Sequence, residues 1–228
     1  MNCDDVIEKL KSMGNPENVA GMARFGISSE NTLGISVTSL RALAKEIGID
    51  HDLALELWDT QIHEAQMLAT LIDDPSAVTV KQAERWVVDI DSWDIADGLA
   101  FNLFWKAPFA YDKAYEWSDR SEEFVKREGF ALMAKLALSD KTAPDERIAG
   151  FLPFIKKGAT DERNFVKKAV NWALRQVGKR NLALNKQALG AAREIQAMDS
   201  KSARWIAADA IRELEGDAVQ ERLKKRGR

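Results

Sequence analysis

Apolar residues recur at helical spacing along nearly the whole chain. The segments that carry them are rich in Ala, Leu, Glu, Lys and Arg, which are strong helix formers. Alternating β-branched runs would indicate strands, but the two candidates, "GISV" and "AVTV", are too short to build a sheet. The pattern therefore predicts an all-α protein.

The predicted helices come in pairs joined by short polar linkers such as "DDPSA". The pairs are 51–59 with 63–74, 80–90 with 93–105, 111–119 with 122–140, 145–158 with 161–181, and 185–200 with 202–216. Successive second helices start roughly 30 to 40 residues apart, which is typical of a HEAT-like or armadillo-type helical solenoid. We expect one solenoid domain over 1–228, with a helical cap at about 1–50, paired repeats at about 51–216 and a basic tail at 217–228.

In a solenoid, equivalent helices stack side by side, so the second helices are expected to line one concave binding face. Several charged and aromatic residues lie on those predicted helices: Trp93, Asp97, Arg127, Lys135, Lys168, Trp172 and Arg175. One carboxylate, two indoles and several cations on one concave face would make a binding or catalytic site.

The bulk composition, with 46% hydrophobic and 30% charged residues, is that of a soluble globular protein. Cys3 is the sole cysteine, so the chain has no internal disulfide framework. No apolar run approaches the roughly 20 residues that span a bilayer, and the acidic N-terminus is unlike a signal peptide. We therefore expect a cytoplasmic protein without a membrane partner.

The net charge of −3 argues mildly against a nucleic-acid partner, but it hides an uneven distribution. Eight basic residues lie between Lys156 and Arg180 against two acids, Asp161 and Glu162. The C-terminal "RLKKRGR" is basic again, whereas acids crowd into the first 125 positions. The distribution predicts one basic wall that a polyanion could use.

Metal and nucleotide chemistry have little support in the sequence. The segment "QIHEAQML" lacks the second histidine of a zinc-binding H-E-x-x-H motif, so we expect His63 and Glu64 to cap and start their helix. Neither a P-loop nor a G-x-G-x-x-G motif is present. We expect neither a metal nor an organic cofactor.

The seven tryptophans divide into two groups. Trp58, Trp86 and Trp117 end first helices, and we expect them in the core together with Trp105 and Trp205. Trp93 and Trp172 each have a charged residue on the same helical face, Asp97 at i+4 and Arg175 at i+3. For these two indoles the residue pattern leaves packing and surface roles equally open.

The segment "DERNFVKKAVNWALRQVGKR" has two different faces. Lys168, Trp172 and Arg175 share one face, with Lys179 one turn further, and the opposite side is apolar: Phe165, Val166, Ala169, Val170 and Ala173. A solvated basic face is the ordinary interpretation of such a pattern. A row in which an indole interrupts cations also suits a sugar–phosphate backbone, because cations neutralise phosphates and the indole packs on the sugar.

Five segments together resemble a known family: "GISVTSLRALAKEIG", "ELWDTQIHEAQMLATLI", "SWDIADGLA", "KREGFALMAKLAL" and "DERNFVKKAVNWALRQVGKRN". The chain resembles the AlkD-type DNA glycosylases, the HEAT-repeat family within DNA alkylation repair. Members of that family excise N3- and N7-alkylated purines without a metal or an organic cofactor. They need not flip the damaged nucleotide into a deep pocket.

The resemblance implies a role for individual residues. Asp97 corresponds to the catalytic carboxylate, Trp93 and Trp172 to the aromatics that flank the lesion's deoxyribose, and Arg127 to a phosphate-binding cation. Arg41, Lys135 and Arg175 correspond to further DNA-backbone contacts. The helical spacing described above adds Lys168 and Lys179 to the expected DNA-binding residues. Two positions depart from the family: Phe25 replaces a tyrosine, and Val37 replaces a small hydroxyl residue.

The chemistry explains why one carboxylate could suffice. Glycosides usually need a second carboxyl group to protonate the leaving oxygen, but an N3- or N7-alkylated purine already carries a positive charge. One aspartate can then stabilise the developing sugar cation and place a water. We expect a monomer that acts on alkylated double-stranded DNA. The alternatives are a non-catalytic HEAT scaffold that binds nucleic acid or protein through the same face, and a purely protein-binding solenoid.

Overall fold

The computed structural model describes residues 1–226, and every regular element in that range is helical, which confirms the all-α prediction. The chain divides into two compact units, one formed by Met1–Phe109 and one that begins at Ala110. The predicted basic tail begins as a helix at Asp217, and its last two residues, 227 and 228, lie outside the described residues. The expectation of a single solenoid domain stays a prediction.

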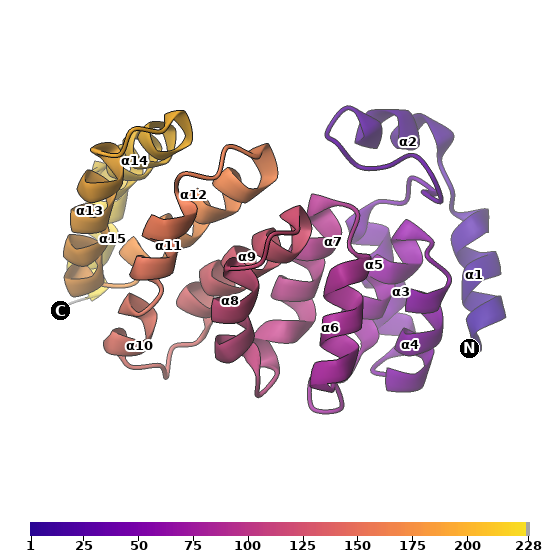
Figure 1. The fold of residues 1–228 in the computed structure, drawn as a ribbon. Coiled ribbons are helices and arrows are strands. Elements are labelled where there is room, and N and C mark those ends of the chain that lie inside the picture. Colours follow the sequence, from indigo (N-terminus) through magenta and orange to yellow (C-terminus); the bar gives the residue numbers. More distant parts are fainter. Residues whose placement is uncertain (227–228) are drawn as a thin grey trace. The chain divides into compact units, whose positions relative to one another are not determined.

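Seven α-helices form the first unit (Figure 1). They are α1 (Cys3–Ser12), α2 (Pro16–Ala23), α3 (Val37–Ile47), α4 (His51–Asp59), α5 (His63–Ile72), α6 (Val80–Asp89) and α7 (Trp93–Gly98). A π-helical turn η1 (Leu99–Leu103) and a 3-10 turn η2 (Phe104–Lys106) follow α7. Several of these helices begin where a side-chain oxygen accepts the free backbone N–H groups of the first turn: at Asn2, Asn15, Ser36, Asp50 and Thr79.

The core of the first unit is built around α5 and a tryptophan stack. Helix α5 contacts α1, α3, α4 and α7, and it is buried from His63 to Thr70. Trp58 of α4 and Trp86 of α6 stack with ring centroids 4.2 Å apart and planes 5° from parallel. Both rings are buried, as is Trp117, so the core role expected for these three tryptophans is confirmed.

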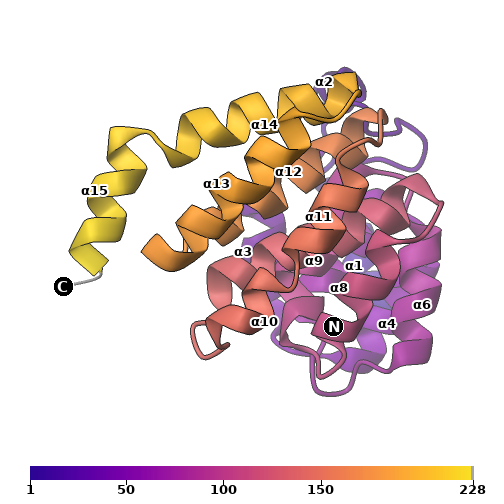
Figure 2. The same cartoon turned by 60° about the vertical axis from the view of Figure 1, so that its left-hand side comes forward.

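Eight helices form the second unit: α8 (Ala110–Ser118), α9 (Glu123–Ser139), α10 (Asp145–Ala149), α11 (Leu152–Gly158), α12 (Asn164–Gly178), α13 (Leu182–Gln196), α14 (Lys201–Leu214) and α15 (Asp217–Arg226). The second helices of successive pairs are neighbours, because α12 packs against both α9 and α14. Figure 2 shows α12, α13 and α14 in succession, followed by α15 at the C-terminal end. This neighbourhood agrees with the repeat pattern.

Two predicted helices and one predicted core residue differ from the structure. The helix expected over 145–158 is two helices, because Pro153 in the first turn of α11 has no N–H to continue the ladder from α10. The helix expected over 93–105 keeps α geometry only to Gly98. Trp205, expected to be packed, is 42% exposed on α14, so that prediction was wrong.

Candidate active site and DNA interface

Helix α7 presents Trp93 and Asp97 on a side that is not packed into the core. Ile95, Ala96 and Gly98 are buried, whereas Trp93 and Asp97 are partly exposed and lie one turn apart. A Cβ atom on Gly98 would lie 2.9 Å from the Met67 sulfur, so a glycine here lets α7 approach α5 closely. The π-helical turn that follows is a feature often found at functional sites.

Hydrogen bonds fix the start of α7 on two sides. The Trp93 indole Nε1 donates to the Phe25 carbonyl oxygen at 3.0 Å, which links α7 to the end of α2. The Asp94 carboxylate lies 2.9 Å from His63 Nε2 and also accepts the backbone N–H of Ile95 at 3.1 Å. The indole and the helix axis are therefore held before any ligand binds.

His63 is buried and Asp94 is partly buried, and each group shifts the pKa of the other. Burial alone lowers the pKa of His63, but the hydrogen bond and charge of Asp94, with nearby Glu64 and Asp91, outweigh it and raise that pKa. Burial raises the pKa of Asp94, and the His63 hydrogen bond and charge outweigh it and lower that pKa. The two shifts together indicate an ion pair of His63 imidazolium with Asp94 carboxylate.

This pair gives the fold a pH dependence with a definite sign. Folding raises the pKa of His63. Its contribution to the free energy of unfolding is therefore complete below the pKa of the unfolded state, about 6.5, and is lost as pH rises through the pKa of the folded state. We expect His63→Gln to destabilise the protein more at pH 5.5 than at pH 8.5, measured as free energies of unfolding in urea. If the difference in free energy of unfolding between wild type and variant grew with pH, that result would contradict the ion pair.

Glu64 holds the segment that precedes α3. Its buried carboxylate accepts three backbone N–H groups: Leu33 at 2.8 Å, Gly34 at 2.6 Å and Ile35 at 3.2 Å. Gly34 has φ +79°, and a Cβ there would lie 2.2 Å from the Asn15 carbonyl oxygen, so only glycine fits. His63 and Glu64 start α5 as expected, but the capping role expected for them was wrong, because both side chains bond residues about 30 positions away.

A cavity of about 580 Å³ opens beside Trp93 in the first unit. It lies between α2, the start of α3 and the start of α7, and its lining includes Met22, Phe25, Ile35, Val37 and Trp93. Phe25 is 72% exposed and Val37 is 45% exposed. The two positions that depart from the family pattern therefore both line an apolar cavity next to the proposed site. Nothing in the residue pattern indicates this cavity.

In the second unit, α12 has the two faces that the sequence predicts. Its apolar side is buried: Val166, Ala169, Val170, Ala173, Leu174 and Val177. Lys168 is exposed, and Trp172 is partly exposed one turn further. Phe165, expected on the buried side, is only partly buried and packs against Phe124 with ring centroids 5.6 Å apart. The predicted row of a cation followed by an indole is thus on the accessible side of α12.

Arg127 and Lys135 belong to the neighbouring helix α9. Arg127 is only 5% exposed, and its Nη1 donates to the Phe165 carbonyl oxygen at 2.8 Å. Lys135 is partly exposed two turns further along α9. The structure therefore holds the Arg127 guanidinium in a fixed position at the α9–α12 contact.

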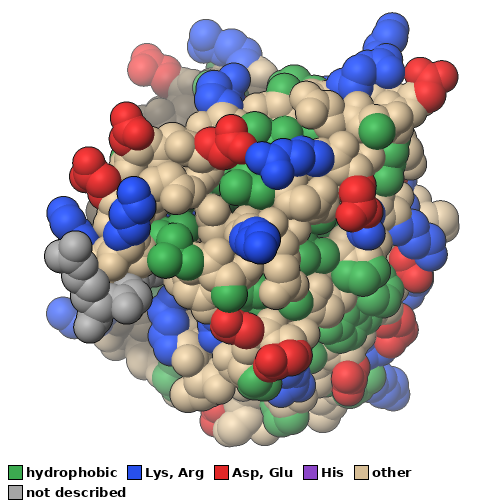
Figure 3. Space-filling view, turned by 90° about the vertical axis from the view of Figure 1, so that its left-hand side faces the viewer, with side chains coloured by type: hydrophobic (Ala, Val, Ile, Leu, Met, Phe, Trp, Pro, Cys, Tyr) green, Lys and Arg blue, Asp and Glu red, His purple; other side chains and the backbone are tan. Residues whose placement is uncertain are grey.

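The segment expected to form a basic wall is largely neutralised by acids. Arg175 lies between Asp209, at 3.7 Å, and Glu213, which also pairs with Lys179 at 2.7 Å. Burial raises the pKa of Glu213, but the two cations outweigh it and lower that pKa. Further basic residues of this segment, Lys156, Lys157, Arg163 and Arg180, also have acidic partners. On the face in Figure 3, basic and acidic side chains lie side by side.

The remaining cations of the predicted interface differ in availability. Lys167 lies 5.4 Å from the centre of the exposed Trp205 ring. Arg41 on α3 and Lys168 on α12 are exposed, and within residues 1–225 neither has an acidic partner. Among the predicted DNA-binding cations, Arg41 and Lys168 are therefore the most accessible to a DNA phosphate.

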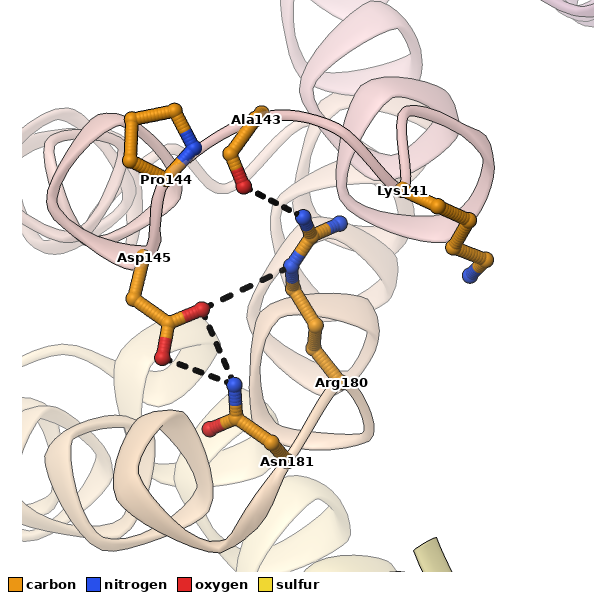
Figure 4. A pocket seen from close by; sticks show the side chains of 6 residues that line it. All are labelled: Lys141, Ala143, Pro144, Asp145, Arg180 and Asn181. Carbon is orange, nitrogen blue, oxygen red and sulfur yellow. Dashed lines mark hydrogen bonds and ion pairs between the residues drawn. The ribbon is translucent and has the colours of Figure 1, made fainter.

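Arg180 has a structural role that its place in the basic segment concealed. Its guanidinium donates to the carbonyl oxygens of Ala137, Asp140 and Ala143. Figure 4 shows the bond to Ala143 and the contact with Asp145, whose carboxylate lies 3.8 Å from Nε. These carbonyls end α9 and begin the following loop, so Arg180, two residues after the end of α12, serves as a cap for α9. The adjoining polar cavity of about 510 Å³ belongs to this network.

The predicted site draws on both units. Trp93 and Asp97, with Arg41, belong to the first unit, whereas Arg127, Lys135, Lys168, Trp172, Arg175 and Lys179 belong to the second. Within each unit the structure brings neighbouring members together, and the convergence of the two groups stays a prediction. Across the described part of the chain, no cluster of three His, Cys, Asp or Glu side chains is arranged to hold a metal ion. None of the described helices has the length and apolar character to cross a membrane.

Comparison with solved structures supports a helical-repeat fold. A protein described as belonging to a new family related to the HEAT-like repeat DNA glycosylases, with affinity for branched DNA structures, superposes with a TM-score of 0.78. It is 21% identical, and the match covers 93% of this chain and 95% of that chain. This similarity confirms the HEAT-like fold that the repeat pattern predicts.

Other similarities are more remote. A designed armadillo repeat protein in complex with a (KR)4 peptide is 17% identical over 83% of this chain and 80% of its own, with a TM-score of 0.39. No curated protein matches the chain. Residues 6–214, by contrast, match the family described as DNA alkylation repair enzymes. Because this match spans nearly the whole sequence, the chain belongs to the family of DNA alkylation repair enzymes.

Proposed function

We propose that this DNA repair enzyme is a glycosylase that excises positively charged N3- and N7-alkylated purines from duplex DNA. The observation that carries the proposal is α7, which places Trp93 and Asp97 one turn apart on the partly exposed side of a helix whose other side is buried. Membership of the alkylation repair family supports alkylated DNA as the substrate. The site would act without a metal or an organic cofactor.

Asp97 is the only carboxylate that the reaction requires. An alkylated purine leaves as a neutral base, so the glycosidic nitrogen needs no general acid. The Asp97 carboxylate stabilises the oxocarbenium-like sugar as it forms, and it positions the water that attacks C1′. The indole face of Trp93 beside the sugar adds cation–π attraction of roughly 0.5–2 kcal/mol. The family resemblance implies the same role for Trp172.

We expect the predicted cations to contribute differently to binding of the DNA backbone. Arg41 and Lys168 are exposed and have no acidic partner among residues 1–225, and they would bind phosphates directly. Arg127, which is held by the Phe165 carbonyl, would position the phosphate nearest the lesion, with Lys135 on the same helix. Arg175 and Lys179 would have to exchange the Glu213 carboxylate for a phosphate, so we expect a smaller contribution to affinity from them.

A second candidate is non-catalytic binding of DNA, and one observation favours it. The related solved protein is described by its affinity for branched DNA structures. The neutralised cations of α12 also suggest weaker binding to an unbranched duplex than a fully basic surface would give. A scaffold of this kind would hold a DNA junction without cleaving a glycosidic bond.

The deciding experiment measures base release and binding on the same protein. Methylated duplex DNA is incubated with excess protein, and free 7-methylguanine and 3-methyladenine are quantified by mass spectrometry. We expect release of both bases, and duplex binding that weakens as salt rises. Tight binding to a four-way junction without base release would favour the scaffold. An absence of salt-dependent affinity for any DNA would favour a protein partner.

A further inference from the structure

Helices α12 and α14 pack together through a row of matched side chains, and one position of this row differs from the others. Residues 38 positions apart contact each other along the two helices: Lys167 with Trp205, Asn171 with Asp209, and Arg175 with Glu213. At the first of these positions an indole ring stands where the other two have a carboxylate. Lys167 therefore meets an aromatic ring on α14, at 5.4 Å from Nζ to the ring centre, in place of an acid.

Trp205 is exposed on a surface whose other prominent side chains are basic. It leaves 42% of its surface open, and Arg204 and Lys201, one residue and one turn before it on α14, are exposed as well. Lys168 and Lys201 have no acidic partner among residues 1–225. Arg204 pairs with Asp199 at 3.3 Å, but an exposed pair of this kind holds its cation only weakly. We use the name Trp205 patch for five residues: Lys167, Lys168, Lys201, Arg204 and Trp205.

Other acids at this end of α14 already accept hydrogen bonds from the protein. The Glu162 carboxylate accepts the Ser200 hydroxyl at 2.8 Å and the Ser202 backbone N–H at 3.1 Å, where α14 begins. The Asp209 carboxylate accepts the Asn171 amide at 2.7 Å. These acids hold the helices in place, and the Trp205 patch keeps an excess of positive charge around its indole.

The chemistry of the Trp205 patch favours a nucleic acid over a protein. Lysine is depleted at protein–protein interfaces, whereas three of the four cations of the patch are lysines. Cations neutralise phosphates, and an aromatic face stacks on any nucleobase whatever its sequence. Bases inside a duplex are covered by their neighbours in the stack, so an exposed indole requires a base that is not part of a duplex.

We propose that the Trp205 patch binds an unpaired nucleotide in a single-stranded segment of DNA. The base stacks on the Trp205 indole, and the adjoining phosphates are bound by Lys167 and Lys168. Membership of the DNA alkylation repair family makes DNA the expected nucleic acid. The proposal goes beyond the proposed glycosylase function, because it requires neither a damaged base nor Asp97. It would let the enzyme hold DNA in which a duplex adjoins a single strand.

The test compares two forms of one undamaged duplex whose overhangs carry the same charge. One form has a 3′ overhang of about five thymidines, and the other has the same number of abasic sites and phosphates. Binding of the full chain is measured by fluorescence anisotropy. We expect wild type to bind the thymidine form at least about fivefold more tightly than the abasic form. Trp205→Leu should bind both forms equally, whereas Trp205→Phe should keep most of the preference, because a phenyl ring can still stack.

Two further variants separate stacking from other effects. Leu182→Ala is the matched control for loss of exposed apolar surface, since Leu182 is 47% exposed on α13 of the same unit. It should bind both forms as wild type does. Lys167→Gln should weaken binding to both forms alike and keep the preference for thymidine. The slope of log affinity against log salt concentration should become shallower by about 0.7, as expected for the loss of one phosphate contact on a single strand.

The outcomes distinguish this proposal from its alternatives and from the proposed function. Equal affinity of wild type for the two forms would overturn it, as would an undiminished preference in Trp205→Leu. If Trp205→Leu weakened binding to the abasic form as much as to the thymidine form, Trp205 would contact the duplex end or the backbone, and the proposal would again fail. Because this DNA carries no lesion, a protein that releases no alkylated base can still show the expected preference.

Discussion

Asp97→Asn is expected to slow the release of 7-methylguanine from methylated duplex DNA by roughly 10²–10³-fold. The substitution keeps the size of the side chain but removes the negative charge that opposes the developing charge on the sugar. Loss of one preorganised electrostatic group at a reacting centre typically has an effect of this order. The measurement is single-turnover base release with enzyme in excess, so that the binding step does not limit the rate.

The control for Asp97→Asn is Asp91→Asn. Asp91 precedes α7 by two residues and is exposed, so its substitution removes the same charge from the same region. We expect Asp91→Asn to release base at nearly the wild-type rate. The affinity of Asp97→Asn for DNA should be unchanged or slightly higher, because a carboxylate near a phosphate repels it. Equal rates for Asp97→Asn and wild type would exclude the mechanism.

Local periodicity predicted the parts of this protein that depend on near neighbours in sequence. The buried side of α12 and the core tryptophans Trp58 and Trp86 follow from apolar residues at helical spacing. The break between α10 and α11 was readable in principle, because Pro153 cannot continue a helix. Position along one helix was therefore enough to identify most elements and one face of each.

Interactions between distant residues could not be predicted in this way. Arg175 and Lys179 were expected to face DNA, but Asp209 and Glu213 meet them only once α14 packs on α12. Arg180 similarly caps α9 from about 40 positions away. A count of charges along one segment does not show which of them a neighbouring helix neutralises. Asp97 and Trp172 likewise belong to different units, so position along one helix does not show whether they lie close together.

Glu64 has a structural role that the sequence did not reveal, because an acid in the first turn of a helix is ordinarily explained by the helix dipole. We expect Glu64→Ala to lower the free energy of unfolding by roughly 3–5 kcal/mol, since two buried N–H groups and one partly buried N–H group lose their acceptor. Glu64→Gln should lower it by only about 1–3 kcal/mol. The amide oxygen can take the place of Oε1, which serves Gly34 and Ile35, while the NH₂ group then faces the N–H of Leu33.

The order of the three variants tests this explanation more sharply than any one value. Glu8→Ala, at an exposed position of α1, is the control and should change the free energy of unfolding in urea by less than about 0.5 kcal/mol. In Glu64→Gln, hydrogen exchange at the Leu33 amide should accelerate more than at Gly34, because only Leu33 loses its acceptor. Uniform acceleration across 33–35 would instead mean that the whole segment detaches. Unchanged exchange at Leu33 would mean that the carboxylate does not hold it. Since this segment also lines the cavity beside Trp93, the same experiment reports how firmly the protein holds that wall of the cavity.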